Sequence, residues 1–275
     1  MKRYLNITFC LLLLASMTFM GCGDDDDCPA CPQDIENAIM FAQIYLASGS
    51  LLLYGQILCE DATMPDIDSV KLEGNDVALI EMFGTVFVGY TFSGSYLSGN
   101  LTSGDSVRID IFTPHGNSVC ELPVLAYSQD VPIIIDWTMG YPYDTVARNT
   151  DIEINWYHVV NAEWYAVSTA YYFGLGPESS RHDRSYTTDT TFTIPASETS
   201  MNGYYSIRIY SVTGPTPDVE GGNIIGGYVK GVVNSSMETG LPIIIGDGLG
   251  PPLSNRGADR SDPDFIEIYR ELKNK

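Results

Sequence analysis

The chain has 275 residues and a formal net charge of −21, with 44% hydrophobic and only 18% charged residues. Typical soluble proteins have about 25% charged residues. So acidic a surface repels phosphate backbones, which excludes nucleic-acid binding as an expected function. The length allows one large or two ordinary domains, and the 18 tyrosines, 26 glycines and 15 prolines favour strands joined by turns.

The first 22 residues have the three parts of a secretion signal. Lys2 and Arg3 form a basic start, residues 7–20 form an apolar run, and Gly21 precedes Cys22. The run is shorter than the roughly 20 residues that a membrane-spanning helix needs, so residues 1–21 are predicted to be a signal peptide. An ordinary secretory signal that happens to end near a cysteine is the alternative.

The sequence FMGC at residues 19–22 resembles the signal of bacterial lipoproteins, in which cleavage leaves a cysteine at the new N-terminus. The resemblance implies acyl chains on Cys22 and anchoring in a membrane, because more than one buried chain gives stable attachment. Loss of residues 1–21 would remove two basic residues and no acidic ones, taking the net charge from −21 to −23.

Four consecutive aspartates, Asp24 to Asp27, follow the cysteine. Their mutual repulsion keeps the chain extended, so residues 22–35 are predicted to form an acidic tether. The run resembles the acidic patch of lipoproteins that Bacteroidetes-like bacteria carry to the outer face of the outer membrane. This resemblance implies an outer-membrane location, either exposed at the surface or facing the periplasm.

The cysteines that follow fall into two pairs. A CxxC pair such as Cys28 and Cys31 can be a redox couple, half a zinc site or a small disulfide loop. No second CxxC or nearby histidine completes a zinc site, and prolines after both cysteines favour an oxidised or inert tether. Cys59 and Cys120, 61 residues apart, are the candidates for a bridge within a domain.

Residues 36–127 are predicted to form an immunoglobulin-like β-sandwich, because turn signals separate short strand patterns such as the alternating Val107, Ile109 and Ile111. Residues 35–46 fit one face of a helix as well as a strand, and their Ile, Phe and Tyr content favours the strand. Prolines and polar residues at 123–132 predict a hinge.

Residues 131–240 resemble a fibronectin type III domain. The family pattern places a core Trp at the end of the second strand, then a small-residue turn and Tyr-x-Val, and later Tyr-x-aliphatic-x-aliphatic. The matching residues are Trp156, Ala162, Tyr165, Val167, Tyr205, Ile207 and Ile209, with Phe192 and Ile194 as a further inward pair. The resemblance implies that Tyr205 hydrogen-bonds to backbone at a corner, and strand alternation points Ser168 and Arg208 outward.

The last segment, residues 241–275, is predicted to be a tail that is rich in Gly and Pro and ends in a short helix. Phe265, Ile268, Tyr269 and Leu272 would form the packing stripe of this helix. Because termini fray unless they are tied down, a helix that docks on the second domain is the simplest interpretation.

No catalytic residue, metal site or cofactor is predicted. His115, His158 and His182 have no spacing typical of paired metal ligands. Ser106, in the sequence GDSV, resembles the nucleophile block of certain esterases, but it begins a strand rather than joining a strand to a helix.

Aromatic side chains form the candidate binding surface. If Trp156 points inward, then alternation points its neighbours and their cross-strand partners outward. These outward residues are predicted to be Tyr157, Trp164, Tyr204 and Tyr210. Exposed aromatic rings beside acidic groups stack on sugars or anchor a protein partner. The alternative is that these rings pack on the first domain or on the tail.

The sequence therefore predicts an all-β protein of two consecutive sandwiches. Partly by analogy with fibronectin type III domains, it favours a non-enzymatic binding or spacer protein that contacts a protein or a glycan at the bacterial envelope. Its predicted partners are a membrane, through the lipid anchor, and a protein or glycan of unknown identity. The alternative is a glycan-binding component of a polysaccharide-uptake system, and a hydrolase with unrecognised carboxylates or serine ranks third.

Overall fold

The computed structural model describes residues 38–59, 63–83, 88–135, 144–173, 180–246 and 265–274. The predicted signal peptide, the acidic tether and Cys22, Cys28 and Cys31 lie outside these residues. Sixteen strands and one helix form the regular structure of the described part, so the all-β prediction is confirmed. In that part, no helix has the length and apolar character to cross a membrane.

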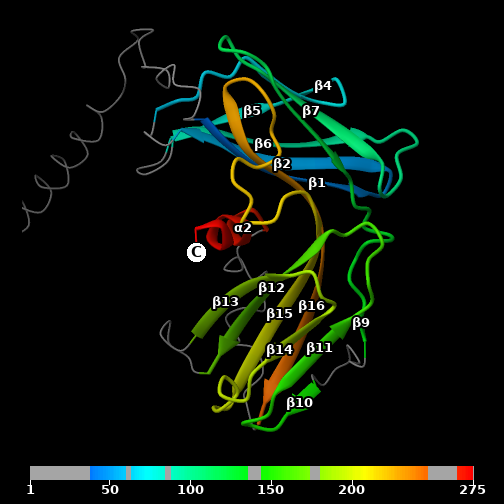
Figure 1. Cartoon of the computed structure of the whole chain (residues 1–275), viewed down its shortest axis with the longest axis vertical. Helices are drawn as coiled ribbons and strands as arrows, with labels where there is room; N and C mark the ends of the chain where they lie inside the picture. The colour runs from blue at the N-terminus through cyan, green and yellow to red at the C-terminus, as the bar shows by residue number, and fades with distance from the viewer. Residues whose placement is uncertain are drawn as a thin grey trace, which may run out of the picture.

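The strands form two β-sandwiches stacked along the long axis of the molecule (Figure 1). In the upper sandwich, one layer consists of β1 (Ala38–Ala47), β2 (Ser50–Cys59), β6 (Val88–Leu97) and β5 (Leu79–Phe83). The facing layer consists of β4 (Asn75–Val77), β3 (Ser69–Leu72), β7 (Ser106–Phe112) and β8 (Ser118–Pro123). The ambiguous segment at 35–46 is therefore a strand over its described residues, as its composition indicates.

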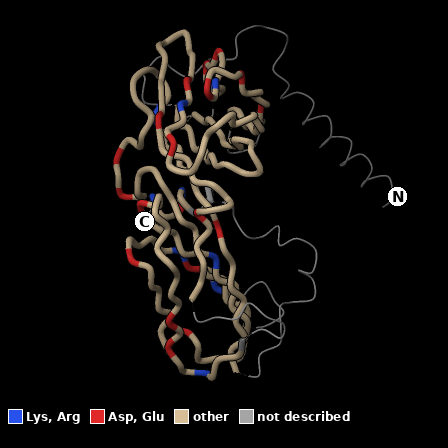
Figure 2. The backbone as a smooth tube through the Cα atoms, turned by 90° about the vertical axis from the view of Figure 1, so that its right-hand side faces the viewer, with Lys and Arg blue, Asp and Glu red and all other residues tan. Residues whose placement is uncertain are grey.

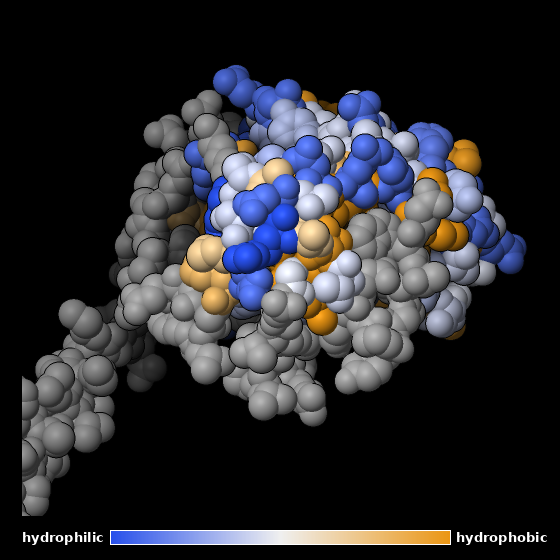
Figure 3. Space-filling model, turned by 90° about the horizontal axis from the view of Figure 1, so that it is seen from below, coloured by the Kyte–Doolittle hydropathy of each residue, from blue (hydrophilic) through white to orange (hydrophobic). Residues whose placement is uncertain are grey.

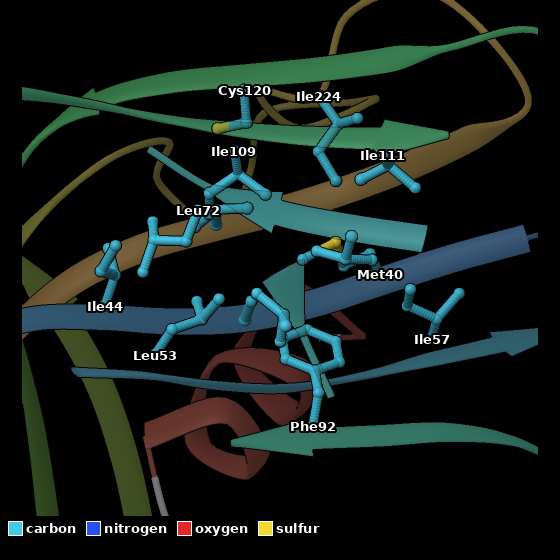
Figure 4. Close-up of a cluster of buried hydrophobic side chains, with 14 of the residues drawn as sticks. Met40, Ile44, Leu53, Ile57, Leu72, Phe92, Ile109, Ile111, Cys120 and Ile224 are labelled. Carbon is cyan, nitrogen blue, oxygen red and sulfur yellow. The ribbon is translucent and has the colours of Figure 1, made fainter. Parts of the chain in front are cut away.

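Alternating side chains from the two layers meet in the upper core. Met40 and Ile44 on β1 and Leu53 on β2 are fully buried, and they face Ile109 and Cys120 of the other layer (Figure 4). Because side chains alternate along a strand, each strand of an antiparallel pair gives one face to this core. This one-sided burial explains why apolar and polar residues alternate in the sequence of β7.

The lower sandwich has the strand arrangement of a fibronectin type III domain, with three strands facing four. The smaller sheet contains β9 (Ile134–Ile135), β11 (Ile152–Trp156) and β14 (Thr191–Ile194). The larger contains β13 (Ser180–Thr187), β12 (Trp164–Tyr172), β15 (Gly203–Thr213) and β16 (Val229–Ile245), and β10 (Asp144–Val146) pairs with β16. The β-sandwich predicted for this segment is confirmed.

The residues that carry the fibronectin resemblance share one core. Trp156, Tyr165, Val167, Tyr205, Ile207 and Ile209 are buried together, with Ala162 and Phe192 packed against them. The Tyr205 hydroxyl donates to the Glu198 carbonyl oxygen at 3.4 Å, which is the predicted corner bond. Ser168 departs from the prediction, because it is buried rather than exposed on the outer face of its sheet.

A single long strand, β16, belongs to both sandwiches. Residues 229–235 pair in parallel with β1, and residues 235–245 pair antiparallel with β15. The two halves of the molecule therefore share one nine-stranded sheet, and the long strand is visible running from top to bottom in Figure 1. The boundary predicted at residue 240 was wrong, because it falls inside this strand, and the first sandwich is completed by residues far beyond 127.

Residues 215–227 connect β15 to β16 and are too many for a hairpin turn, because this segment also belongs to the upper sandwich. This segment leaves the lower sandwich and pairs with β8, where Val119 and Ile225 exchange backbone hydrogen bonds of 2.9 and 2.7 Å. Ile224 and Tyr228 then enter the upper core. The connection is thus part of the first sandwich, although it lies between two strands of the second.

The segment at 123–132, predicted to be a hinge, is tied to both sandwiches. Asp130 is 2% exposed and accepts hydrogen bonds from Ser103 Oγ, from the Ala126 backbone N–H at 2.7 Å and from Asn161 Nδ2 at 3.5 Å. Its own carbonyl oxygen accepts from Ser211 Oγ at 2.5 Å. A buried carboxylate is stable only while its hydrogen-bond donors stay in place. Because these donors belong to both sandwiches, the segment is a fixed joint between them rather than a hinge.

Acidic side chains are spread along both sandwiches, with few basic ones among them (Figure 2). In this view, the acidic residues are distributed along the length of both sandwiches. This distribution is typical of a solvated surface.

We expect Asp130→Ala to lower the free energy of unfolding by about 2–3 kcal/mol, because the buried Ala126 N–H and the partly buried Ser103 and Asn161 donors lose this acceptor. Denaturant unfolding monitored by circular dichroism measures this change. Asp189→Ala, at an exposed position, is the matched control and should change stability by less than about 0.5 kcal/mol. Equal values for the two variants would contradict the fixed joint.

Candidate binding surface

The structure separates the four predicted binding aromatics into exposed and buried ones. Tyr157 is 61% exposed and Tyr204 is partly exposed, but Trp164 and Tyr210 are only 1% and 3% exposed. The prediction that Trp164 and Tyr210 form a binding surface was therefore wrong. The alternative, that these rings pack on the tail, describes them correctly.

The C-terminal helix α2 (Phe265–Lys273) covers the two buried rings. Tyr269 and Leu272 of α2 pack in one cluster with Trp164 and Tyr210, and the ring centroids of Trp164 and Tyr269 are 6.2 Å apart. The Trp164 indole N–H donates to the Gly214 carbonyl oxygen at 2.9 Å. The docked helix in the tail is thus confirmed.

The helix also contacts the upper sandwich. Arg270 donates to Gln56 Oε1 on β2 at 3.0 Å, and its guanidinium lies 4.9 Å from the centroid of the Phe41 ring on β1. The Tyr269 hydroxyl donates to the Thr216 carbonyl oxygen at 3.2 Å. Because α2 touches both sandwiches and the β15–β16 connection, it reinforces the joint between them.

We expect deletion of residues 265–275 to shift Trp164 fluorescence to longer wavelength, because the indole loses its apolar cover. The shift should vanish in the same deletion carrying Trp164→Phe, which leaves Trp156 buried in the lower core. Tyr269→Ala in the full chain should lower the free energy of unfolding by about 3 kcal/mol. An unchanged emission spectrum would show that α2 does not cover Trp164.

A hollow of about 310 Å³ lies on the same outer face of the lower sandwich, farther along β15 and β16 from α2. Its lining residues are Tyr204, Ser206, Arg208, Glu238, Gly240, Leu241 and Pro242. The strand register explains the set, because Ser206 pairs with Pro242 and Arg208 pairs with Gly240. Small residues at the centre of the set leave the space open.

The hollow presents hydrogen-bond donors and acceptors together. Arg208 lies 3.5 Å from Glu238, so the two charges largely offset each other, and both side chains are partly exposed. Burial and then the nearby Glu238 raise the pKa of the Tyr210 hydroxyl beside them. Tyr204 adds an aromatic ring whose centroid is 6.1 Å from that of Tyr172. The site is therefore polar, nearly neutral and walled by an aromatic ring.

The end of the molecule seen in Figure 3 is mostly hydrophilic over its described residues, with apolar residues between the polar ones. Among the residues that the structure describes, no group of three or more His, Cys, Asp or Glu side chains could hold a metal ion. The lining of the hollow offers hydrogen bonding through Ser206, Arg208 and Glu238 and stacking on Tyr204.

The predicted bridge between Cys59 and Cys120 is not formed. Cys120 is a free thiol in the upper core, where burial raises its pKa to about 12. It lies on β8, whereas Cys59 ends β2 in the facing layer and pairs with Ala38. Cys59 itself is disulfide-bonded.

Sequence reasoning placed Tyr204 and Arg208 on the outer face but missed their partners. Glu238, Gly240 and Pro242 lie on β16, which the prediction divided between the second domain and the tail. The signal that could have found them is the apolar run at 241–245, which is typical of a strand rather than of a tail.

No protein-family model matches the chain, and no curated protein matches it. The solved structures matched by the chain include titin domains A168–A170, with 9% identity and a TM-score of 0.20, covering 74% of this chain and 65% of that one. The chicken CNTN1 FN1–FN3 domains give 10% identity and a TM-score of 0.27, covering 78% and 68%. The titin Ig tandem A164–A165 gives 10% identity and a TM-score of 0.20, covering 76% and 97%. Similarities this low do not support a fold assignment. The fold class is established by the chain's own sheets, which form two β-sandwiches, the second FnIII-like.

Proposed function

We propose that this chain is a lipid-anchored, non-enzymatic binding or spacer protein of the bacterial cell envelope. The anchor is Cys22 and the acidic run after it is the tether, so that the two sandwiches stand away from the outer membrane. The FnIII-like fold of the lower sandwich is compatible with a role in contact or spacing.

The observation that carries the spacer role is the continuous strand β16. A strand of 17 residues hydrogen-bonded in both sandwiches holds them as one body, whereas domains joined only by a linker move relative to each other by default. A fixed body presents its surfaces at a defined distance and orientation from its attachment point. This rigidity is useful in a spacer or a scaffold for binding.

The hollow on the lower sandwich favours glycan binding as the second candidate. Its volume is at the lower end of the range for small-ligand sites. A partly exposed tyrosine can stack on a sugar ring, and the Arg208–Glu238 pair can donate to and accept from sugar hydroxyls without favouring a charged ligand. A component of a polysaccharide-uptake system would have such a site.

Mass spectrometry of the mature N-terminus tests the anchor. We expect a chain that begins at Cys22 and carries acyl groups, because the signal resembles a lipoprotein signal. Cys22→Ala should abolish acylation and release the protein from the membrane fraction. An unmodified soluble wild-type chain would reject the anchor while leaving the fold untouched.

A glycan array tests the second candidate. We expect Tyr204→Ala to weaken sugar binding about fivefold, because the loss of stacking on an aromatic ring is worth roughly 1 kcal/mol. Gly240→Leu should block binding by filling the hollow, without removing a side chain. The fold should tolerate the leucine, since a β-carbon at this position meets only the Ile207 carbonyl oxygen at 3.8 Å. Tyr157→Ala, directly after β11 and outside the lining of the hollow, is the control and should bind as wild type. A wild-type protein that binds no sugar would reject this candidate.

A further inference from the structure

The two ends of the nine-stranded sheet are very different. One end is β13, whose sequence contains Arg181, His182, Asp183 and Arg184. Arg184 forms an ion pair with Glu271 of α2, so this edge is both charged and partly covered. Proteins block unwanted strand pairing with charges and cover of this kind.

The other end, β5, lacks such protection. β5 has the sequence LIEMF with Glu81 as its one charged residue, and it pairs with β6 on one side only. Ile80 and Phe83 are 58% and 73% exposed. Within the described residues, no strand occupies the other side of β5. Its outer backbone groups are placed to pair with another strand.

The remaining sheet edges in the described part are short or covered. β4, β9 and β14 have only three, two and four residues. β8 is covered by the bridge between Val119 and Ile225. Among the described strands, an apolar strand of five residues at an edge that no other described strand covers is therefore the exception.

We propose that β5 binds an extended segment of a partner protein, which adds a strand to the sheet. The partner segment alternates apolar and polar residues and carries a lysine or arginine opposite Glu81. Backbone hydrogen bonds supply affinity in this mode of recognition, and side chains supply specificity. This surface is separate from the hollow on the lower sandwich, so the proposal stands independently of glycan binding.

Charge selects the partner. Glu81 is exposed, and both Glu81 and Asp66 act on Tyr90 of the neighbouring strand, whose pKa is raised by burial and then by these two acids. The whole chain is also strongly acidic. The negative potential at this end of the sheet therefore attracts a basic strand.

The same charge disfavours a second copy of the chain. If two β5 strands paired antiparallel over their full length, Glu81 would lie opposite Glu81. Like charges directly opposite each other destabilise a strand pair. The occupant is accordingly a different, basic polypeptide.

Fluorescence anisotropy with synthetic peptides tests the proposal on the detergent-solubilised full chain. The probe is a labelled peptide of alternating valine and threonine with a central lysine, and its matched probe has a central glutamate. The wild type should bind the lysine peptide about fivefold more tightly, since a favourable cross-strand charge pair replaces a repulsive one. Glu81→Lys should reverse this preference.

Two controls decide whether the edge of β5 is the binding site. Asp183→Lys, on the opposite edge of the sheet, should leave the preference of the wild type unchanged. A lysine peptide with N-methylated amides along one edge should lose binding, because it cannot complete the backbone ladder. Absence of binding, equal binding of both peptides to Glu81→Lys and wild type, or a dimer through β5 in light scattering would each overturn the proposal.

Discussion

The parallel pairing of β1 with the first part of β16 is the interaction on which the rest of the molecule depends. β1 is the first described strand and β16 is the last, yet seven consecutive residues of each are in register. Without this pairing, the upper sheet would end at β1. The same strand then continues into the lower sandwich, where it pairs with β15 and forms one wall of the hollow.

Buried polar groups fix the angle at which the two sandwiches meet. Ser235 Oγ accepts from the Leu125 backbone N–H at 2.7 Å, and Thr213 Oγ1 donates to the Pro123 carbonyl oxygen at 3.0 Å. The Gln43 side chain on β1 donates to the Ser236 carbonyl oxygen at 3.5 Å. Each bond joins residues of different segments at the joint, and a buried polar group left unpaired is costly. The joint is therefore specific in geometry as well as stable.

Local patterns in the sequence predicted the sandwich layers well. The alternation of β7 and the Trp156, Tyr165 and Tyr205 positions in the lower domain follow from period-2 burial, which acts over a few residues. The strand β1 was also predicted from its composition. These features depend on neighbours in the chain, so a single sequence contains the information.

The joint could not be predicted in the same way. The middle of β16 contains Asn234, Ser235 and Ser236, which are all buried although they are polar. The partners of Ser235 and Ser236, Leu125 and Gln43, are far away in the sequence, and so no periodic pattern marks the strand there. For the same reason, the burial of Trp164 depends on Tyr269 in the tail, and the alternation of β12 alone could not show that a helix covers its outer face.

The shared strand also dictates when the molecule can fold. Gln43 and Ser236, which are hydrogen-bonded to each other, are 193 positions apart in the chain. The N-terminal sandwich cannot close while the ribosome has made only its own residues, although most multidomain chains fold from the N-terminus onward. Until residues 229–235 emerge, β1 has an unpaired side that invites association with other chains. Nascent or truncated forms that lack β16 therefore leave this side of β1 open to other chains.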